Sequence, residues 1–215
     1  MALAALAIVA CSQSDSIPPL PVKVVREVLV FPAEVELVAG TSRQLSAQLN
    51  DANGEPVGGA KLAFATEQTE LLDLSIRGRV RSRGPVGTGT VVVESGTATA
   101  RVPVVVVPGK PARLRRLGAE AAAAAQPPLA AGALAVVVTD NFGNPVPRCE
   151  VVFRFRQQNS APQTIRTDAR GIATLASVGQ GAQPVDVDVQ VVAAPRVRTS
   201  YRALPAPPAA SPAVK

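Results

Sequence analysis

Histidine and tryptophan are both missing from this chain of 215 residues, and aromatic residues make up only 3% of it. The absence of histidine removes the commonest general base, the usual metal ligand and the side chain that titrates near neutral pH. Without tryptophan and with few aromatics, any core must be built from aliphatic side chains, and hydrophobic residues supply 47% of the chain. The composition therefore predicts a folded protein and argues against an enzyme.

Cysteine is scarce as well, since only Cys11 and Cys149 occur. A catalytic cysteine needs a base beside it, and the chain has no histidine to act as one. Cys149 alternates in phase with Val151 and Phe153, so we expect a buried and unreactive thiol. If Cys11 is lipidated, as argued below, Cys149 has no partner in the chain for a disulfide.

Sequence signatures of catalysis and cofactor binding are also absent: there is no phosphate loop, metal cluster, paired-carboxylate signature or nucleophile elbow. We predict no enzyme activity and no cofactor. Four carboxylates raise a calcium hypothesis, because oxygen-rich sites at the ends of β-sandwiches bind this ion. They form no single ligand loop, and we predict no metal site: Asp140, Asp168, Asp186 and Asp188.

The charge is unbalanced towards the basic side, with a net charge of +6 and a pI near 10.1. A basic balance favours acidic partners such as anionic lipid, polysaccharide or nucleic acid. The alternative is that a chain rich in Arg, Ala and Pro reflects a general compositional bias. Charge alone does not decide between them.

What is present, and organises the chain, is a turn at residues 140–147, Asp-Asn-Phe-Gly-Asn-Pro-Val-Pro. Asp140 can accept hydrogen bonds from its own downstream backbone, and Gly143 can adopt a positive φ without a Cβ clash. Pro145 fixes its own φ and holds the preceding residue extended. Alternating apolar runs lead in and out, so the turn is predicted to join two strands.

A looser copy of this turn lies at residues 51–57, Asp-Ala-Asn-Gly-Glu-Pro-Val. Asp51 aligns with Asp140 at an offset of 140 − 51 = 89 residues, and the apolar runs on both sides align at the same offset. Such self-similarity indicates two domains of one type in tandem. A repeat of this length is close to the size of an immunoglobulin-like sandwich, roughly 100 residues.

These motifs resemble bacterial immunoglobulin-like domains. The first copy is similar to the group 2 type and the second to the group 1 type found in intimin and invasin. The matching positions include Gly40, Asp51, Gly54, Phe64, Gly78, Val80 and Gly89 in the first copy, and Asp140, Gly143, Pro145, Val151, Phe153, Asp168 and Gly171 in the second. Phe64 departs from a family tryptophan. The resemblance implies an extracytoplasmic β-sandwich and brings no catalytic residue.

The N-terminal segment reads as a targeting signal. Residues 1–10 are almost wholly apolar, too few to span a bilayer but of the length of a signal-peptide core. Residues 8–11, Ile-Val-Ala-Cys, resemble a lipobox, which would make Cys11 the lipidated first residue of the mature protein. No Lys or Arg precedes the apolar core, which departs from the lipoprotein pattern. An ordinary cleaved signal with an incidental cysteine is the alternative.

The predicted organisation is all-β, with two tandem immunoglobulin-like β-sandwiches at residues 23–107 and 112–203. A lipoprotein signal peptide at 1–10 and a flexible tether at 11–22 come before them. A short Pro-rich linker at 108–111 joins them, and its stiffness favours an end-to-end rod. A Pro/Ala-rich tail at 204–215 is predicted to be disordered.

Two shorter segments carry more local predictions. Residues 71–76 are predicted as a strand of the first domain. The alanine-rich run at 119–125 is too short to form a stable helix alone, so we predict an irregular or helical-turn excursion.

Arginine alternates along residues 77–83, Arg-Gly-Arg-Val-Arg-Ser-Arg. On a strand Arg79, Arg81 and Arg83 would share one face, which makes them a candidate anion-binding stripe. The alternative is a solvated strand face opposite an inward Val80. No aromatic residue interleaves the arginines, so we predict no nucleic-acid binding.

The sequence thus predicts a non-enzymatic cell-envelope lipoprotein that acts as a structural or adhesive binding module. We expect anchoring to the outer membrane through the lipid at Cys11, on the surface or the periplasmic face, with a protein or polysaccharide partner at the cell surface. Two alternatives stay open: an accessory subunit of an envelope or secretion assembly, and an anion- or glycan-binding module.

Overall fold

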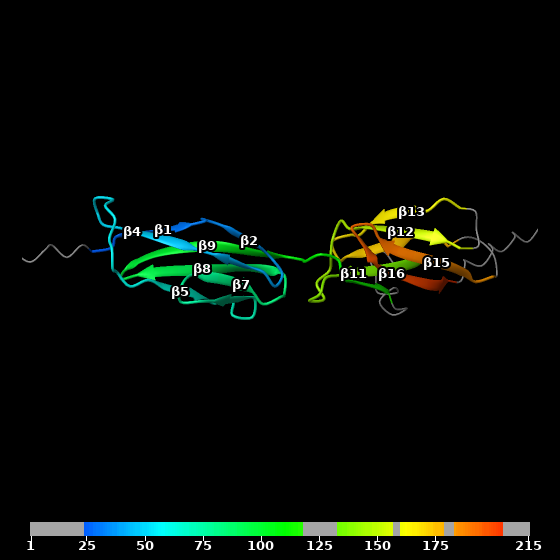
Figure 1. Cartoon of the computed structure of the whole chain (residues 1–215), viewed down its shortest axis with the longest axis horizontal. Helices are drawn as coiled ribbons and strands as arrows, with labels where there is room; N and C mark the ends of the chain where they lie inside the picture. The colour runs from blue at the N-terminus through cyan, green and yellow to red at the C-terminus, as the bar shows by residue number, and fades with distance from the viewer. Residues whose placement is uncertain (1–23, 118–132, 157–159, 179–182, 204–215) are drawn as a thin grey trace, which may run out of the picture.

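Every regular element in the described part of the chain is a β-strand, which confirms the predicted all-β class of two tandem immunoglobulin-like sandwiches. The computed structural model describes residues 24–117, 133–156, 160–178 and 183–203. Cys11, the 119–125 run and the C-terminal tail lie outside these ranges. The two sandwiches follow one another along the long axis of the molecule (Figure 1).

The first sandwich contains nine strands in three hydrogen-bonded groups. One sheet has the order β2-β9-β8-β5, a second has the order β3-β7-β6, and β1 pairs with β4. The parallel pairing of β2 with β9 contrasts with the antiparallel pairing of the others. The strands are β1 (Glu27–Phe31), β2 (Val35–Val38), β3 (Ser42–Gln44), β4 (Ser46–Asn50), β5 (Ala63–Thr66), β6 (Leu72–Leu74), β7 (Arg79–Ser82), β8 (Gly87–Ser95) and β9 (Ala98–Val107).

The second sandwich packs a four-stranded sheet, β13-β12-β15-β16, against a three-stranded sheet, β10-β11-β14. All its pairings are antiparallel. Its strands are β10 (Arg113–Arg116), β11 (Leu134–Thr139), β12 (Glu150–Phe155), β13 (Gln163–Arg166), β14 (Ile172–Leu175), β15 (Val185–Val191) and β16 (Ala194–Ala203).

Each sandwich has a separate core, and valine dominates both. In β15 the valines at alternate positions are buried while Asp186, Asp188 and Gln190 point outward. Cys149 is buried too, with 7% of its surface exposed, and it belongs to the second core. Aliphatic side chains therefore make up most of both cores, and the fully buried Phe153 adds an aromatic ring to the second.

One predicted strand is shorter than expected. Residues 71–76 were predicted to be extended throughout, but β6 covers only Leu72–Leu74, and Ile76 is 92% exposed. The reason is a tight turn directly after β6. The Gly78 amide donates to the Ser75 carbonyl at 3.0 Å, and the Ser75 amide donates to the Arg79 carbonyl at 3.0 Å. Ile76 lies at the tip of this turn, where no core surface can cover it.

No helix in the described ranges has the length and apolarity needed to cross a membrane.

Candidate functional site at the domain junction

One turn geometry occurs three times in the two sandwiches, each time built on an aspartate. Asp51, Asp140 and Asp168 each accept hydrogen bonds at one carboxylate oxygen from the backbone amides two and four residues downstream. The six distances lie between 2.8 and 3.0 Å. These aspartates therefore fix the turns locally, as an aspartate at the start of a turn can do.

The repeat with an offset of 89 residues extends to individual hydrogen bonds. The Asp51 amide donates to the carbonyl four residues on at 2.9 Å, and the Asp140 amide does the same at 3.0 Å. Gly54 and Gly143 have positive φ values of 79° and 87°. Isolated bridges close the two turns at Pro56 and Pro145. The same local chemistry thus builds the same turn in both sandwiches.

The second copy differs because its aspartate also holds the linker. The second oxygen of Asp140 accepts a hydrogen bond from the Gly109 amide at 2.8 Å and from Nδ2 of Asn144 at 2.9 Å. Asp140 is only 1% exposed. Burial alone would raise the pKa of Asp140. The hydrogen bonds from the Asn144 side chain and from the amides of Gly109, Asn144 and Phe142 outweigh burial and hold the pKa below its ordinary value.

Asn144 connects the two sandwiches directly. Its Nδ2 also donates to the backbone carbonyl of Gly84 at 2.7 Å, and Gly84 belongs to the first sandwich. Asn144 is 9% exposed, so this hydrogen bond is shielded from water. A shielded bond of this kind is costly to break without a replacement partner.

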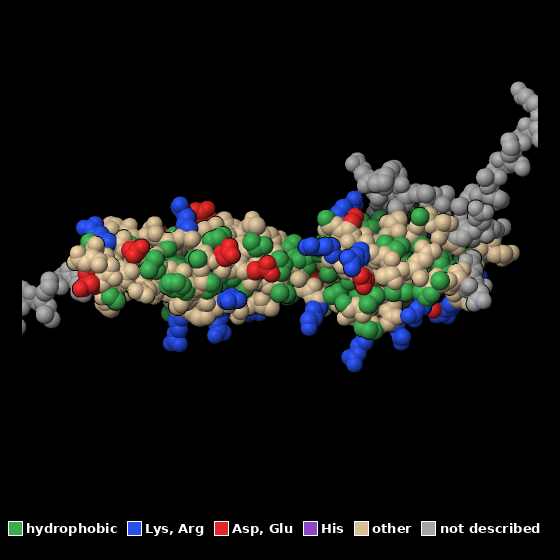
Figure 2. Space-filling view, turned by 90° about the horizontal axis from the view of Figure 1, so that it is seen from above, with side chains coloured by type: hydrophobic (Ala, Val, Ile, Leu, Met, Phe, Trp, Pro, Cys, Tyr) green, Lys and Arg blue, Asp and Glu red, His purple; other side chains and the backbone are tan. Residues whose placement is uncertain are grey.

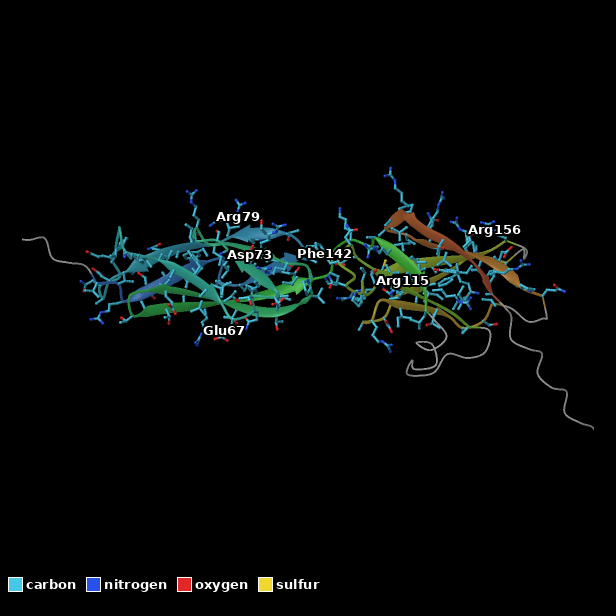
Figure 3. The ribbon with its side chains drawn as sticks, turned by 90° about the horizontal axis from the view of Figure 1, so that it is seen from below. Glu67, Asp73, Arg79, Arg115, Phe142 and Arg156 are labelled. Carbon is cyan, nitrogen blue, oxygen red and sulfur yellow. The ribbon has the colours of Figure 1, made fainter. Side chains whose placement is uncertain are left out.

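Phe142 is the third connection, and it is an apolar one. The ring lies against Gly40 and Gly84, where a Cβ atom on either glycine would approach within 2.4 Å of a ring carbon. Figure 3 places Phe142 where the two sandwiches meet. Half of the side chain, 52%, remains exposed, so the ring covers the joint rather than filling a core.

These contacts join the turn of the second sandwich to two loops of the first. We call Phe142, Asn144, Asp140, Gly84 and Gly40 the junction. The offset makes clear what changed between the copies: Phe142 aligns with Asn53 and Asn144 aligns with Glu55. The sequence analysis did not identify these positions as a site. An aromatic residue within an otherwise polar turn was the signal that could have drawn attention to Phe142.

The arginine stripe lies near the junction without forming part of it. Arg79 and Arg81 are exposed on β7, on the face opposite the buried Val80, and Arg83 follows the strand. Arg81 is the cross-strand partner of Asp73 in β6. Arg81, Arg83 and Asp73 line a small hollow of about 260 Å³ together with Gly40, Ser82 and Phe142. A carboxylate therefore stands opposite the middle arginine.

The remaining candidate residues are spread over the second sandwich. Asp140 and Asp168 lie in turns, whereas Asp186 and Asp188 lie on the outer face of β15. Within the described ranges no three side chains of a metal-binding type come together. Burial, with a smaller contribution from the charge of Glu150, raises the pKa of the Cys149 thiol, which keeps the sulfur protonated and weakly nucleophilic.

No family model matches the sequence, and no curated protein matches it either. Similar solved structures exist. InvD of Yersinia pseudotuberculosis is 16% identical over 88% of this chain and 59% of its own, with a TM-score of 0.50. The Escherichia coli adhesin FdeC is 18% identical over 83% of this chain and 62% of its own, with a TM-score of 0.47.

Domains 4 and 5 of the S-layer protein SbsC are 23% identical over 40% of this chain and 53% of their own, with a TM-score of 0.36. The chain thus spans between 53% and 62% of these three structures. At these identities the similarity to InvD establishes the fold, a tandem bacterial immunoglobulin-like arrangement, and nothing about ligands.

Proposed function

We propose that this chain is a non-enzymatic structural and adhesive module of the cell envelope. Its two sandwiches act as one stiff spacer that holds a binding surface away from the point of attachment. The observation that carries the proposal is the junction, where a turn of the second sandwich bonds to the first at Gly84. A pair of freely moving domains needs no such contact.

Several features of the junction support stiffness together. The linker between the sandwiches is short and its Gly109 amide is held by Asp140. Asn144 donates across the joint to Gly84, and Phe142 packs on Gly40 and Gly84. Contacts on the linker, on one loop and on a second loop restrain bending in more than one direction. A rod of this kind transmits force and fixes distance, which are mechanical rather than chemical tasks.

The test is the distance between the two sandwiches, measured by pulsed electron spin resonance. Spin labels are placed at Thr99→Cys and Thr164→Cys, which are exposed strand positions on different sandwiches. Cys11→Ser removes the other reactive thiol, and buried Cys149 stays unlabelled. We expect one narrow distance distribution. A distribution as broad as that of an unrestrained linker would refute the stiff spacer.

Attachment through Cys11 is part of the same proposal. The lipobox-like residues 8–11 support it, because two or more acyl chains on an N-terminal cysteine give stable membrane attachment. Intact mass of the protein from a membrane fraction tests the anchor. A mass that begins at Cys11 with added acyl chains is expected, and an unmodified mass would remove the anchor but leave the spacer standing.

A further inference from the structure

The charge of the chain is concentrated in the second sandwich. Residues 112–203 carry 11 Lys and Arg against 6 Asp and Glu, a net charge of +5, whereas residues 23–107 carry 9 of each. Several basic side chains project from the second sandwich in Figure 2. The difference of five charges comes from two more basic residues and three fewer acidic residues in the second sandwich, 11 − 9 and 9 − 6.

Part of this charge lines a groove on the outer face of the sheet β13-β12-β15-β16. The groove has a volume of about 510 Å³. Its lining comes from β12, β15 and β16 and from the residue that directly follows β12: Arg154, Arg156, Asp188, Val189, Gln190, Arg198, Thr199 and Ser200. Figure 3 shows Arg156 on the second sandwich, away from the junction. The groove is therefore separate from the residues that join the sandwiches.

The register places two arginines on opposite sides of the groove. Arg154 of β12 is paired with Asp188 of β15, and Arg198 of β16 is paired with Gln190 of β15. Arg154 and Arg198 are thus two strands apart and one side-chain step apart along the sheet. With ordinary strand spacing their Cα atoms are roughly 12 Å apart. An extended ligand is needed to contact both.

The centre of the groove is already neutralised. Arg156 donates to both carboxylate oxygens of Asp188, from Nε at 2.9 Å and from an Nη at 2.8 Å. Ser200 donates to the same carboxylate at 2.5 Å. Neither Arg154 nor Arg198 makes a salt bridge with another described residue, although the charge of Arg154 acts on Asp188 opposite it and helps to lower the pKa of that carboxyl. Arg154 and Arg198 therefore keep their positive charges available on the two sides of the groove, whose centre is polar.

The fold does not require arginine at these two positions, because the matching positions of the first sandwich are neutral, although Arg101 of β9 lies outward on the same face as the partner of Val92. There Ala65 of β5 is paired with Val92 of β8, in the place of Arg154 and Asp188. Glu94 of β8 is paired with Thr99 of β9, in the place of Gln190 and Arg198. Outward positions on such a face tolerate neutral residues, so folding alone does not account for Arg154 and Arg198.

We infer that this groove binds an acidic polysaccharide, a chain whose carboxylate or sulfate groups reach Arg154 and Arg198 while a hydroxyl donates to Oε1 of Gln190, whose Nε2 already donates to the Pro195 carbonyl. Guanidinium groups bind carboxylate and sulfate oxygens by paired, charge-assisted hydrogen bonds. Among the described residues of this face no aromatic side chain points outward to stack a nucleic-acid base. The inference rests on the proposed binding module and names its surface and ligand class.

Binding of the full chain to immobilised polygalacturonate and heparin tests the inference, with neutral dextran, single-stranded DNA and phosphatidylglycerol vesicles as comparison surfaces. The test variant is Arg154→Ala with Arg198→Ala. The matched control is Arg113→Ala with Arg170→Ala, exposed residues of the same sandwich on β10 and in the Asp168 turn. Both variants lower the net charge by the same amount.

We expect salt-sensitive binding to one or both acidic polysaccharides, weakened about tenfold or more in the test variant and less than about twofold in the control. Equal losses in the two variants, an unchanged test variant, or no binding by the parent chain would overturn the inference. So would stronger binding to DNA or to vesicles. The distance distribution between the sandwiches is measured on the same samples, so failure here is distinguishable from failure of the spacer.

Discussion

Replacement of Gly40 by alanine is the sharpest perturbation of the junction, because the chain contains a matched control. Gly40 and Gly54 have the same φ of 79°. A Cβ on Gly40 would lie 2.4 Å from a carbon of the Phe142 ring, whereas a Cβ on Gly54 would meet no atom within 4 Å. Both substitutions bear the same backbone strain, about 1–2 kcal/mol. Only Gly40→Ala must also displace the ring.

The size of the additional effect follows from the exposure of Phe142. A buried phenylalanine removes roughly 150–250 Å² from water, at about 25 cal/mol per Å². Phe142 is 52% exposed, so its covered half contributes about 2 kcal/mol to docking of the two sandwiches. Loss of that amount shifts the docking equilibrium roughly thirtyfold. The Asn144 hydrogen bond to Gly84 contributes about 1 kcal/mol, which is too little to offset the free energy of docking lost with the ring.

The assay is the spin-label distance distribution described for the spacer, measured together with the free energy of unfolding of the first sandwich. We expect a broadened distribution for Gly40→Ala and an unchanged one for Gly54→Ala. In a Phe142→Ala background the two alanines should cost the same free energy of unfolding, since no ring remains to be displaced. Identical distance distributions for Gly40→Ala and Gly54→Ala would refute the assigned role of Phe142.

Three further outcomes are expected. In urea unfolding, Asp140→Ala should destabilise the second sandwich by about 3 kcal/mol, and Asp51→Ala should destabilise the first by about 1 kcal/mol. The reason is that, of these two aspartates, only Asp140 is buried and accepts hydrogen bonds from four donors. Equal losses of free energy in the two variants would contradict this. The lowered pKa of Asp140 means that its contribution is present above the unfolded pKa and is lost as pH falls through the lower folded pKa. The acid loss of stability should therefore be smaller in Asp140→Asn, and an identical acid profile would count against it. In a Cys11→Ser background Cys149 should react with a thiol reagent only after unfolding, given its burial and raised pKa; fast reaction in native buffer would show an accessible thiol.

The turns were predictable because their chemistry is local. An aspartate, a glycine and a proline within six residues act on the backbone of those same residues, so Asp140, Gly143 and Pro145 identify the turn without knowledge of the rest of the fold. The repeat at 89 residues then gave the domain type. The alternation of valine with polar residues along β15 is local in the same way, because side chains on a strand have a period of two.

The junction was not predictable, because it depends on a contact between distant residues. Asn144 donates to Gly84, 60 residues earlier in the chain. The local sequence around either residue does not predict its contact with the other. The predicted strand at 71–76 was too long for a related reason: the apolar Ile76 fits the pattern, and only the turn at Gly78 removes it from the sheet.

The groove, too, was only partly predictable from the sequence. Arg154 points outward from β12, in alternation with the buried Val151 and Phe153, and Arg156 directly follows the strand. Their position opposite Arg198 follows from the strand order β12-β15-β16, which alternation does not supply. The sequence instead drew attention to Arg79, Arg81 and Arg83, because they are adjacent in the chain. Residues that are neighbours across strands cannot be recognised from the sequence pattern of a single strand.

The most direct test of the stiff spacer is the alignment of the two sandwiches in solution, measured by residual dipolar couplings on the labelled full chain. The account predicts that backbone amides of residues 24–107 and of the described parts of 112–203 fit a single alignment tensor in the relative orientation of Figure 1. Two tensors of different magnitude, one for each sandwich, would mean that the sandwiches move independently and that the junction does not hold them.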